Sequence, residues 1–341
     1  MDGPPRPVPT PCRDRERSVR LPMTPGITGP HCRLAAVMRA VVYAPGAPAN
    51  LDFGEVPEPD PGPDQVVVDV HAFALNFGEI HWIEHARKPG EVPGWDAAGV
   101  VARAAADGSG PPVGTRVVTF DAAGGWARQR VAATGNLAVL PESVDFAAAA
   151  ALPVAGVTAL QAIRELGPVV GRRVLITGAS GGVGRFAVQL AARAGAHVVA
   201  AVGSPARGAG LRELGADEVV VGLDDVTEPL FGVLDNVGGP LLAQAFSLLG
   251  DGGSLLSIGM ASGQPTTIDF EAERRRYTRK QLAPFNVRFP LDADMRYLVQ
   301  LLADGGLDPQ IGLRDSWDNV TAAAEALLNR KVAGKAVLDV R

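Results

Sequence analysis

The hydrophobic pattern of residues 174–202 changes twice within a short span. An apolar run from Val174 stops at a cluster of glycines, and apolar residues then recur every three to four positions between Phe186 and Ala194. A second apolar run begins at His197. A period near 3.6 is typical of an amphipathic helix, and short apolar runs bounded by glycine are typical of buried strands. The pattern predicts a strand, a glycine turn, a helix and a second strand.

The rest of the chain shows two kinds of patterning. From residue 38 to about residue 150, short apolar or alternating runs are separated by Pro-Gly and glycine-rich turns, which indicates a β-rich region. From about 156 to 260, strand-like and helix-like segments alternate, which is typical of a parallel sheet with helices on both faces. The expected strands are 38–43, 66–75, 99–103, 116–120, 175–176, 198–202, 218–221, 232–235, 255–258 and 336–340, and the expected late helices are 295–302 and 320–329.

Residues 1–37 differ from the remainder in composition. They hold eight of the 28 prolines and six arginines, without periodic apolar positions. We expect a disordered leader here, with the folded protein beginning near Met38. Both cysteines, Cys12 and Cys32, lie in this segment. The expected folded body therefore has no disulfide and no cysteine ligand, which favours a cytoplasmic location.

Charge and hydropathy narrow the class of protein. The formal net charge is −5 and no long basic stripe occurs, so nucleic acid is not the expected partner. No apolar run approaches the roughly 18–20 residues that a membrane-spanning helix needs. No secretory h-region is evident either. These features favour a protein that acts on a small molecule.

The glycine turn at residues 178–184 has the features of a phosphate-binding turn. It reads A-x-G-x-x-G, a variant of the usual G-x-G-x-x-G in which Ala179 takes the first position. Gly181 would let backbone N–H groups approach a pyrophosphate, and Gly184 would let the helix lie close to the strand. The helix N-terminus offers unpaired donors and a positive dipole end. We expect a dinucleotide to contact Gly178, Ala179, Ser180, Gly181, Gly182, Val183 and Gly184.

The end of the second strand indicates which dinucleotide binds. A fold selective for NAD usually places an acidic residue there, on the ribose hydroxyls. This chain has no acid until Glu213, and Ser204 and Arg207 follow the strand instead. A guanidinium pairs well with a phosphate group. We therefore expect NADPH, with Ser204 and Arg207 at its 2′-phosphate, although Arg207 as a solvated loop residue is the alternative.

Five ordered segments resemble the medium-chain dehydrogenase/reductase superfamily, and most closely its zinc-free quinone oxidoreductase branch. They are residues 93–100, 152–159, 178–184, 234–239 and 334–337. The resemblance implies an α/β protein in which a GroES-like catalytic domain, residues 38–155 and 284–341, surrounds a Rossmann cofactor domain, residues 156–283. It also implies a homodimer. Further cofactor contacts that it implies are Thr158, Gly259 and Lys335, the last at the phosphates.

The same resemblance indicates whether a metal ion is expected. Zinc-dependent relatives use a cysteine and a histidine where this chain has Asn76 and Trp95, so we expect no metal. Without a Lewis acid, the tractable reaction is hydride transfer to an electron-poor acceptor, a quinone or an α,β-unsaturated carbonyl. Asn76 would donate its amide to the acceptor oxygen, or else tie down its own loop. His81 takes the position of a family tyrosine and could donate the proton, although it could also be a surface histidine.

Two other readings stay open. The first is a protein that binds NADPH without turnover, either a redox sensor or a nucleic-acid-binding relative, against which the acidic composition counts. The second is an enzyme that reduces an enoyl thioester in place of a quinone or free enone. Assays of NADPH oxidation with different acceptors separate these readings.

Overall fold

The structure is a computed structural model that describes residues 36–340. The leader expected at residues 1–37 lies almost wholly outside this range, and β1 begins at Val37. Two strands, β1 (Val37–Tyr43) and β2 (Leu51–Pro57), form an antiparallel pair. They lie beside a larger, mainly antiparallel sheet with the order β14-β15-β3-β4-β5-β7, in which β6 also pairs with β3. Its strands are β3 (Gln65–Leu75), β4 (Asp96–Arg103), β5 (Arg116–Phe120), β6 (Gln129–Ala133), β7 (Leu137–Val139), β14 (Ile311–Ser316) and β15 (Lys335–Asp339).

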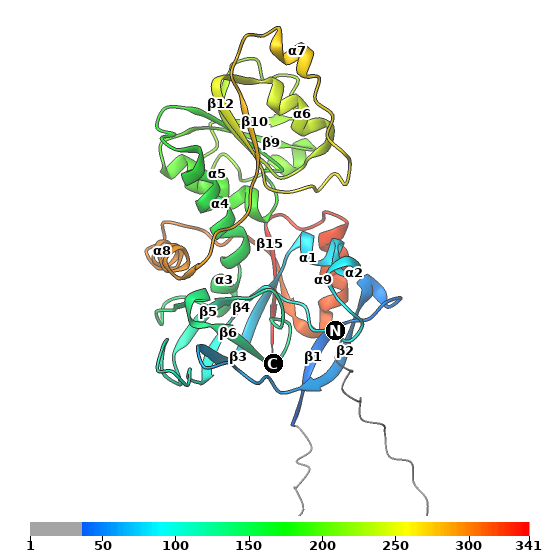
Figure 1. Cartoon of the computed structure of the whole chain (residues 1–341), viewed down its shortest axis with the longest axis vertical. Coiled ribbons are helices and arrows are strands. Elements are labelled where there is room, and N and C mark those ends of the chain that lie inside the picture. Colours follow the sequence, from blue (N-terminus) through cyan, green and yellow to red (C-terminus); the bar gives the residue numbers. More distant parts are fainter. Residues whose placement is uncertain (1–35, 341) are drawn as a thin grey trace, which may run out of the picture. The chain divides into compact units, whose positions relative to one another are not determined.

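The end of the chain returns to this first sheet. β15 pairs antiparallel with β3, so that Ala336 faces Leu75 and Leu338 faces Phe73. Figure 1 shows β15, drawn in red, within this sheet. Strands that are far apart in sequence therefore share one layer. The domain limits expected at 155/156 and 283/284 remain predictions, and the helix α4 (Pro153–Leu166) spans the first of them.

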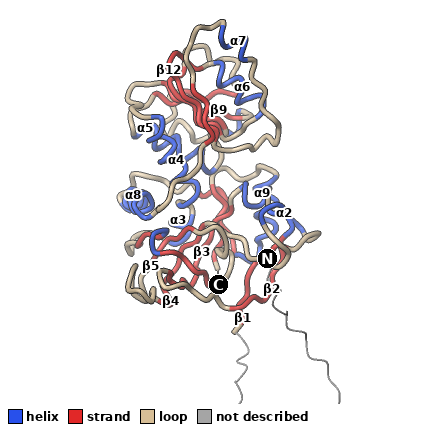
Figure 2. The backbone as a smooth tube through the Cα atoms, in the orientation of Figure 1, coloured by secondary structure: helices blue, strands red, loops and turns tan. Residues whose placement is uncertain are grey.

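A second sheet is parallel throughout, with the order β10-β9-β8-β11-β12-β13. Alternate residues of each strand pack on opposite faces of the sheet, because successive side chains of a strand point in opposite directions. Val174 and Ile176 join the core formed with α4 and α5 (Gly182–Arg193), whereas Leu175 joins the core formed with α6 (Gly239–Ser247). Figure 2 shows helices on both sides of these strands. The strands are β8 (Arg173–Thr177), β9 (His197–Val202), β10 (Glu218–Val221), β11 (Leu230–Asp235), β12 (Leu249–Ser257) and β13 (Gln281–Pro284).

The helices connect and cover these sheets. The α/β class expected from the sequence is confirmed, with a parallel sheet covered on both faces. No helix among residues 36–340 is long and apolar enough to cross a membrane. The helices are α1 (Phe77–His81), α2 (Ile83–Ala86), α3 (Phe146–Ala150), α4 (Pro153–Leu166), α5 (Gly182–Arg193), α6 (Gly239–Ser247), α7 (Phe270–Arg274), α8 (Asp292–Ala303) and α9 (Val320–Leu328).

The expected elements match the observed ones closely where the pattern is strong. The expected strands 116–120 and 218–221 coincide with β5 and β10, and the late helices correspond to α8 and α9. Several strands were not expected, namely β2, β6, β7, β13 and β14. These segments are short or mix exposed and half-buried positions, so they carry little periodicity of their own.

Candidate functional site

The glycine turn lies at the carboxyl end of β8, next to the end of β9. The N–H of Ala179 donates to the carbonyl of Ala201 in β9 (3.1 Å). Gly178 has φ +60°, a conformation that glycine adopts without strain. A Cβ on Gly184 would lie 2.4 Å from the carbonyl oxygen of Gly178. The close approach expected at Gly184 is thus present, since only glycine leaves room for the backbone there.

The start of α5 faces open space at Gly181. A Cβ on Gly181 would meet only the carbonyl oxygen of Gly178, at 3.4 Å. Gly181 is the residue before the helix and has no side chain that could cap it. The first N–H groups of a helix have no intrahelical partner, and they carry a partial positive charge. The turn is therefore built to accept an anionic group such as a pyrophosphate.

Ser204 and Arg207 follow the end of β9, the strand that pairs with β8 and so lies next to the glycine turn. Ser204 precedes the short 3₁₀ turn η3 (Pro205–Gly208), and its carbonyl accepts from the N–H of Arg207 (3.1 Å). The Arg207 guanidinium donates through Nη2 to the carbonyl of Arg330 (3.3 Å). Ser204 and Arg207 are both half-buried. The geometry leaves other guanidinium nitrogens of Arg207 for an anion.

Buried polar contacts join the carboxyl ends of β8 and β11. The Thr177 hydroxyl donates to Asp235 (2.6 Å), and the N–H of Gly238 also donates to this carboxylate (2.8 Å). Burial raises the pKa of Asp235, and the hydroxyl and amide donors partly offset that rise. The N–H of Gly259 donates to the Asp235 carbonyl (3.1 Å), and a Cβ on Gly259 would lie 2.9 Å from the carbonyl oxygen of Asn236. Gly259 therefore lies at the same edge of the sheet as the glycine turn.

A second polar cluster lies between the end of β3 and the start of β4. Asn76, the residue before α1, donates through Nδ2 to Glu79 (3.0 Å) and to Asp96 (3.0 Å). Its Oδ1 accepts from the Lys335 ammonium (2.6 Å). The oxygens of Glu79 and Asp96 and the Lys335 ammonium fix which end of the amide faces which partner. Because both of its amide hydrogens are engaged, Asn76 ties down its own loop, and the role of donor to an acceptor oxygen does not fit this arrangement.

Lys335 points into this cluster. Its side chain is 2% exposed, and its ammonium also donates to Asp96 (3.2 Å) and to the Leu75 carbonyl (3.3 Å). The contact with phosphates implied for Lys335 by the resemblance therefore does not fit either, since all three donors of the ammonium are used inside the protein. The backbone of Lys335 nevertheless lies next to the glycine turn, because the N–H of Gly334 donates to the Ser180 carbonyl (3.0 Å).

Two buried side chains, Glu79 and Arg130, hold Trp95, the residue before β4. The N–H of Trp95 donates to Glu79 (2.6 Å), and the Arg130 guanidinium donates to the Trp95 carbonyl (2.8 Å). Burial, together with the neighbouring Asp96 carboxylate, raises the pKa of Glu79 to about 8. Burial lowers the pKa of Arg130 to about 10. At neutral pH Glu79 therefore holds a proton, while Arg130 stays charged.

The remaining expected residues lie in different surroundings. His81 ends α1 and is exposed, with its ring stacked on Phe77 (centroids 5.0 Å apart) and edge-on to Trp82 (4.6 Å). Thr158 is 6% exposed within α4, and Val183 packs against the core at the start of α5. The exposure of His81 leaves its ring accessible to a small molecule.

Sequence reasoning did not find Glu79 and Asp96. Each had a local signal. Glu79 follows Asn76 by three positions, a spacing at which side chains meet on one turn of helix. Asp96 opens a strand whose following residues, up to the final Arg103, are apolar or glycine, which indicates a carboxyl group carried into the core.

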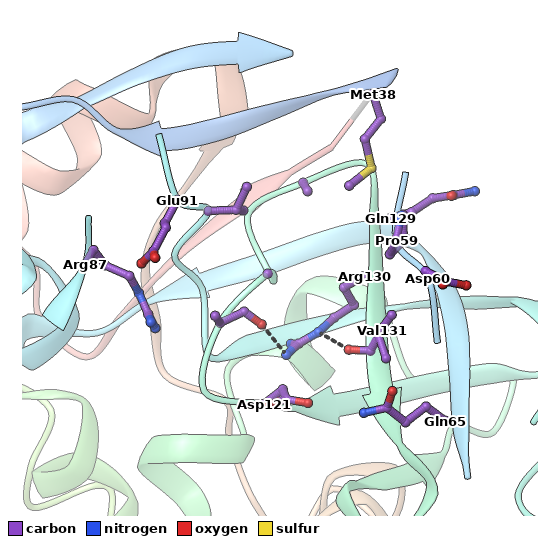
Figure 3. A pocket seen from close by; sticks show the side chains of 14 residues that line it. Met38, Pro59, Asp60, Gln65, Arg87, Glu91, Asp121, Gln129, Arg130 and Val131 are labelled. Carbon is purple, nitrogen blue, oxygen red and sulfur yellow. Dashed lines mark hydrogen bonds between the residues drawn. The ribbon is translucent and has the colours of Figure 1, made fainter. Parts of the chain in front are cut away.

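One pocket of about 600 Å³ lies elsewhere, at β1, β6 and the loop before β6 (Figure 3). Arg87, Glu91, Asp121 and Arg130 give it charges of both signs. Arg130 already donates to the carbonyls of Ala123 and Val131. None of the residues expected to bind the cofactor lines this pocket. We therefore place the candidate site at the glycine turn and the Asn76 cluster.

The comparisons with known proteins agree with this geometry. Residues 62–159 match the model of the alcohol dehydrogenase GroES-like domain, and residues 182–304 match the model described as zinc-binding dehydrogenase. The quinone-oxidoreductase homolog of Spinacia oleracea, described as chloroplastic, is 30% identical over 340 residues, which cover 89% of this chain and 99% of that protein. A cytoplasmic location for this chain thus stays a prediction.

Two further similarities cover different amounts of the chain. The structure of the quinone oxidoreductase from Coxiella burnetii is 26% identical with a TM-score of 0.77, covering 90% of this chain and all of that one. The trans-enoyl reductase tazE of Aspergillus terreus is 34% identical over 204 residues, 53% of this chain and 66% of that protein. The chain, with its GroES-like domain and its dinucleotide-binding Rossmann domain, belongs to the medium-chain dehydrogenase/reductase superfamily of oxidoreductases, in the quinone-oxidoreductase-like branch.

Proposed function

We propose that this oxidoreductase transfers hydride from NADPH to a quinone or an α,β-unsaturated carbonyl without a metal ion. The observation that carries the proposal is the Lys335 ammonium, which lies among the oxygens of Asn76, Asp96 and Leu75. The resemblance aligns Asn76 with a cysteine ligand of the zinc-dependent relatives, and the Asn76 oxygen accepts from this ammonium. A cation is thus already supplied by the protein.

The donor set also argues against a metal. Asn76 directs its nitrogen, which carries the amide hydrogens, toward the side-chain oxygens of Glu79 and Asp96. Within residues 36–340 no group of three His, Cys, Asp or Glu side chains is arranged to hold an ion. Catalytic zinc needs about three nitrogen, sulfur or oxygen ligands around an open position. The residues present do not fit that requirement, so we derive no step through a metal.

The glycine turn fits a dinucleotide. The N-terminus of α5 and the open space over Gly181 would hold the pyrophosphate, and Ser204 and Arg207 would hold the 2′-phosphate that distinguishes NADPH from NADH. When bound, the cofactor supplies the hydride. The chain's part is to orient the two reactants and to supply a proton. We assign that proton to His81, because the ring is exposed at the end of α1.

Steady-state oxidation of NADPH tests the proposal. The purified protein is offered 1,4-benzoquinone and an alkyl enone, before and after dialysis against a chelator, and its metal content is measured by elemental analysis. We expect turnover with at least one acceptor, unchanged by the chelator, and no stoichiometric transition metal. Tight NADPH binding with no turnover in any assay would instead support a redox sensor.

A second candidate function has its own support. The similarity to the trans-enoyl reductase favours reduction of an enoyl thioester. The same hydride-transfer chemistry applies, because the thioester carbonyl also conjugates with the double bond. Crotonyl-CoA added to the acceptor panel decides between them: a preference for the thioester over the free enone would assign the chain to this reaction.

A further inference from the structure

Lys335 spans two parts of the candidate site. A buried lysine is unusual, because its charge loses the solvation that water provides. Here the ammonium reaches Asn76 (2.6 Å) and Asp96 (3.2 Å), with a side chain that is 2% exposed against 0% for Asp96. The cost of burying this ion pair is offset by its own attraction and by the added hydrogen bonds.

The backbone end of Lys335 lies next to the glycine turn. Gly334 forms a parallel bridge with Gly181, and its N–H donates to the Ser180 carbonyl. A Cβ on Gly182 would lie 3.0 Å from Cδ of Lys335, so the lysine stem passes directly over the first residue of α5. Gly334 has φ +85°, and a Cβ there would lie 2.1 Å from the carbonyl oxygen of Gln310. Only glycine permits this close contact.

Asn76 in turn sets the start of α1. It is the residue before the helix, and its side chain fixes Glu79 in the first turn. His81 is the last residue of that helix. A continuous set of contacts thus runs from the phosphate-binding turn through Lys335 and Asn76 to Glu79, in the helix that ends at His81.

We propose that Lys335 is a positioning residue that couples occupancy of the glycine turn to the order of residues 76–86, which contain α1 and α2. A phosphate group on the turn restrains the Ser180 and Gly181 backbone, and with it Gly334 and the lysine stem. The ammonium then holds Asn76 and the helix that carries His81. The kinetic part of this proposal rests on the proposed function, whereas the binding part does not.

Hydrogen–deuterium exchange with and without NADPH tests the coupling. In the wild type, NADPH is expected to protect the glycine turn and also residues 76–86. In Lys335→Met, protection of the turn is expected to remain and protection of residues 76–86 to be lost. Lys331→Met is the matched control, since this lysine is exposed in the same segment. No protection of 76–86 in the wild type, or unchanged protection in Lys335→Met, would overturn the proposal.

Binding and turnover give an independent measurement. In Lys335→Met we expect kcat to fall about tenfold, and the Kd for NADPH to weaken only by the factor by which protection of residues 76–86 is lost, because coupling between two sites is reciprocal. In an Asn76→Ala background, Lys335→Met should have little further effect on kcat, because both changes break the same chain of contacts. A tenfold weaker Kd with kcat retained would show that the lysine serves the phosphates instead.

A double variant that lacks both buried charges controls for simple unfolding. Removing the ammonium alone leaves Asp96 buried without its partner, which is strongly destabilising. The double variant Lys335→Met with Asp96→Asn removes both charges, and it is compared with Asp96→Asn alone. The double variant should lack the protection of residues 76–86 that Asp96→Asn retains. If the wild type reduces no acceptor, the proposed function fails, and the exchange measurement still decides the role of Lys335.

Discussion

Glu79 is a carboxyl group whose protonation follows from where the fold places it. Its pKa rises from 4.5 to about 8 because it is buried next to Asp96, and the donors Asn76 and Trp95 only partly offset this. Between those two pH values the native protein holds a proton that the unfolded chain has released. Stability from this group is therefore complete below pH 4.5 and declines as the pH rises toward about 8.

Glu79→Gln removes this titration. We expect the Tm of the wild type to fall more steeply than that of the variant between pH 4.5 and about 8, as measured by thermal unfolding in a series of buffers. The glutamine amide also loses one hydrogen bond at every pH, which lowers Tm by a constant amount. The quantity to compare is therefore the slope of Tm against pH. Glu55→Gln, an exposed carboxylate in β2, is the control and should keep the wild-type slope. Equal slopes in wild type and Glu79→Gln would contradict the assignment.

Arg207 is expected to select NADPH over NADH. A hydrogen bond from a charged group is worth about 1.5–3 kcal/mol, so Arg207→Ala should reduce the preference about tenfold or more. The ratio of the two Kd values, measured by fluorescence titration, checks this. Arg212→Ala changes an exposed arginine nearby and should leave the ratio unaltered. A preference that survives the loss of Arg207 would place 2′-phosphate recognition elsewhere.

His81 is expected to donate the proton. General acid catalysis is typically worth about 100-fold or more, so His81→Phe should lower kcat by roughly that factor for the enone. Phenylalanine keeps the stacking on Phe77 but has no proton to donate. His85→Phe, an exposed histidine in α2, is the control. A kcat for the enone that His81→Phe leaves unchanged would remove this role.

At the scale of elements, Gly184 and Gly181 have different roles in the turn between β8 and α5. A Cβ at position 184 would meet backbone atoms at 2.4 and 2.6 Å, which cannot move aside cheaply, whereas at position 181 it would meet one atom at 3.4 Å. Gly184→Ala should therefore cost about 1–3 kcal/mol of stability. Gly181→Ala should keep the wild-type Tm and yet weaken NADPH binding, because the methyl group fills the space for the pyrophosphate. Thermal unfolding and titration measure both, and the reverse pattern would contradict this assignment.

At the scale of the molecule, β13 forms one edge of the parallel sheet, pairing with β12. Leu282 in this strand is 41% exposed. An exposed apolar edge strand favours pairing with another chain. We expect the homodimer implied by the resemblance to form here, so Leu282→Arg should shift the mass measured by light scattering from dimer to monomer. Val113→Arg changes an exposed apolar residue of the first sheet's loops and should not. A wild-type monomer would exclude this edge as an interface.

The sequence was sufficient for features that depend on neighbours along the chain. The core strands of the parallel sheet, the glycine turn and α5 follow from periodicity within a few residues, and β8, β9 and β10 lie where the pattern predicts them. Backbone geometry repeats over short distances, so the spacing of apolar side chains records it directly. Two of the five superfamily segments, residues 178–184 and 234–239, lie in this same region.

Only the tertiary structure determined which partners the buried polar groups have. Asn76 and Lys335 lie 259 positions apart and still form a hydrogen bond of 2.6 Å, because β15 returns to pair with β3. No local pattern distinguishes a lysine that faces a phosphate from one that is buried between an amide and a carboxylate. The cost of burying a charge depends on which partners the fold brings to it, and those partners come from distant parts of the chain.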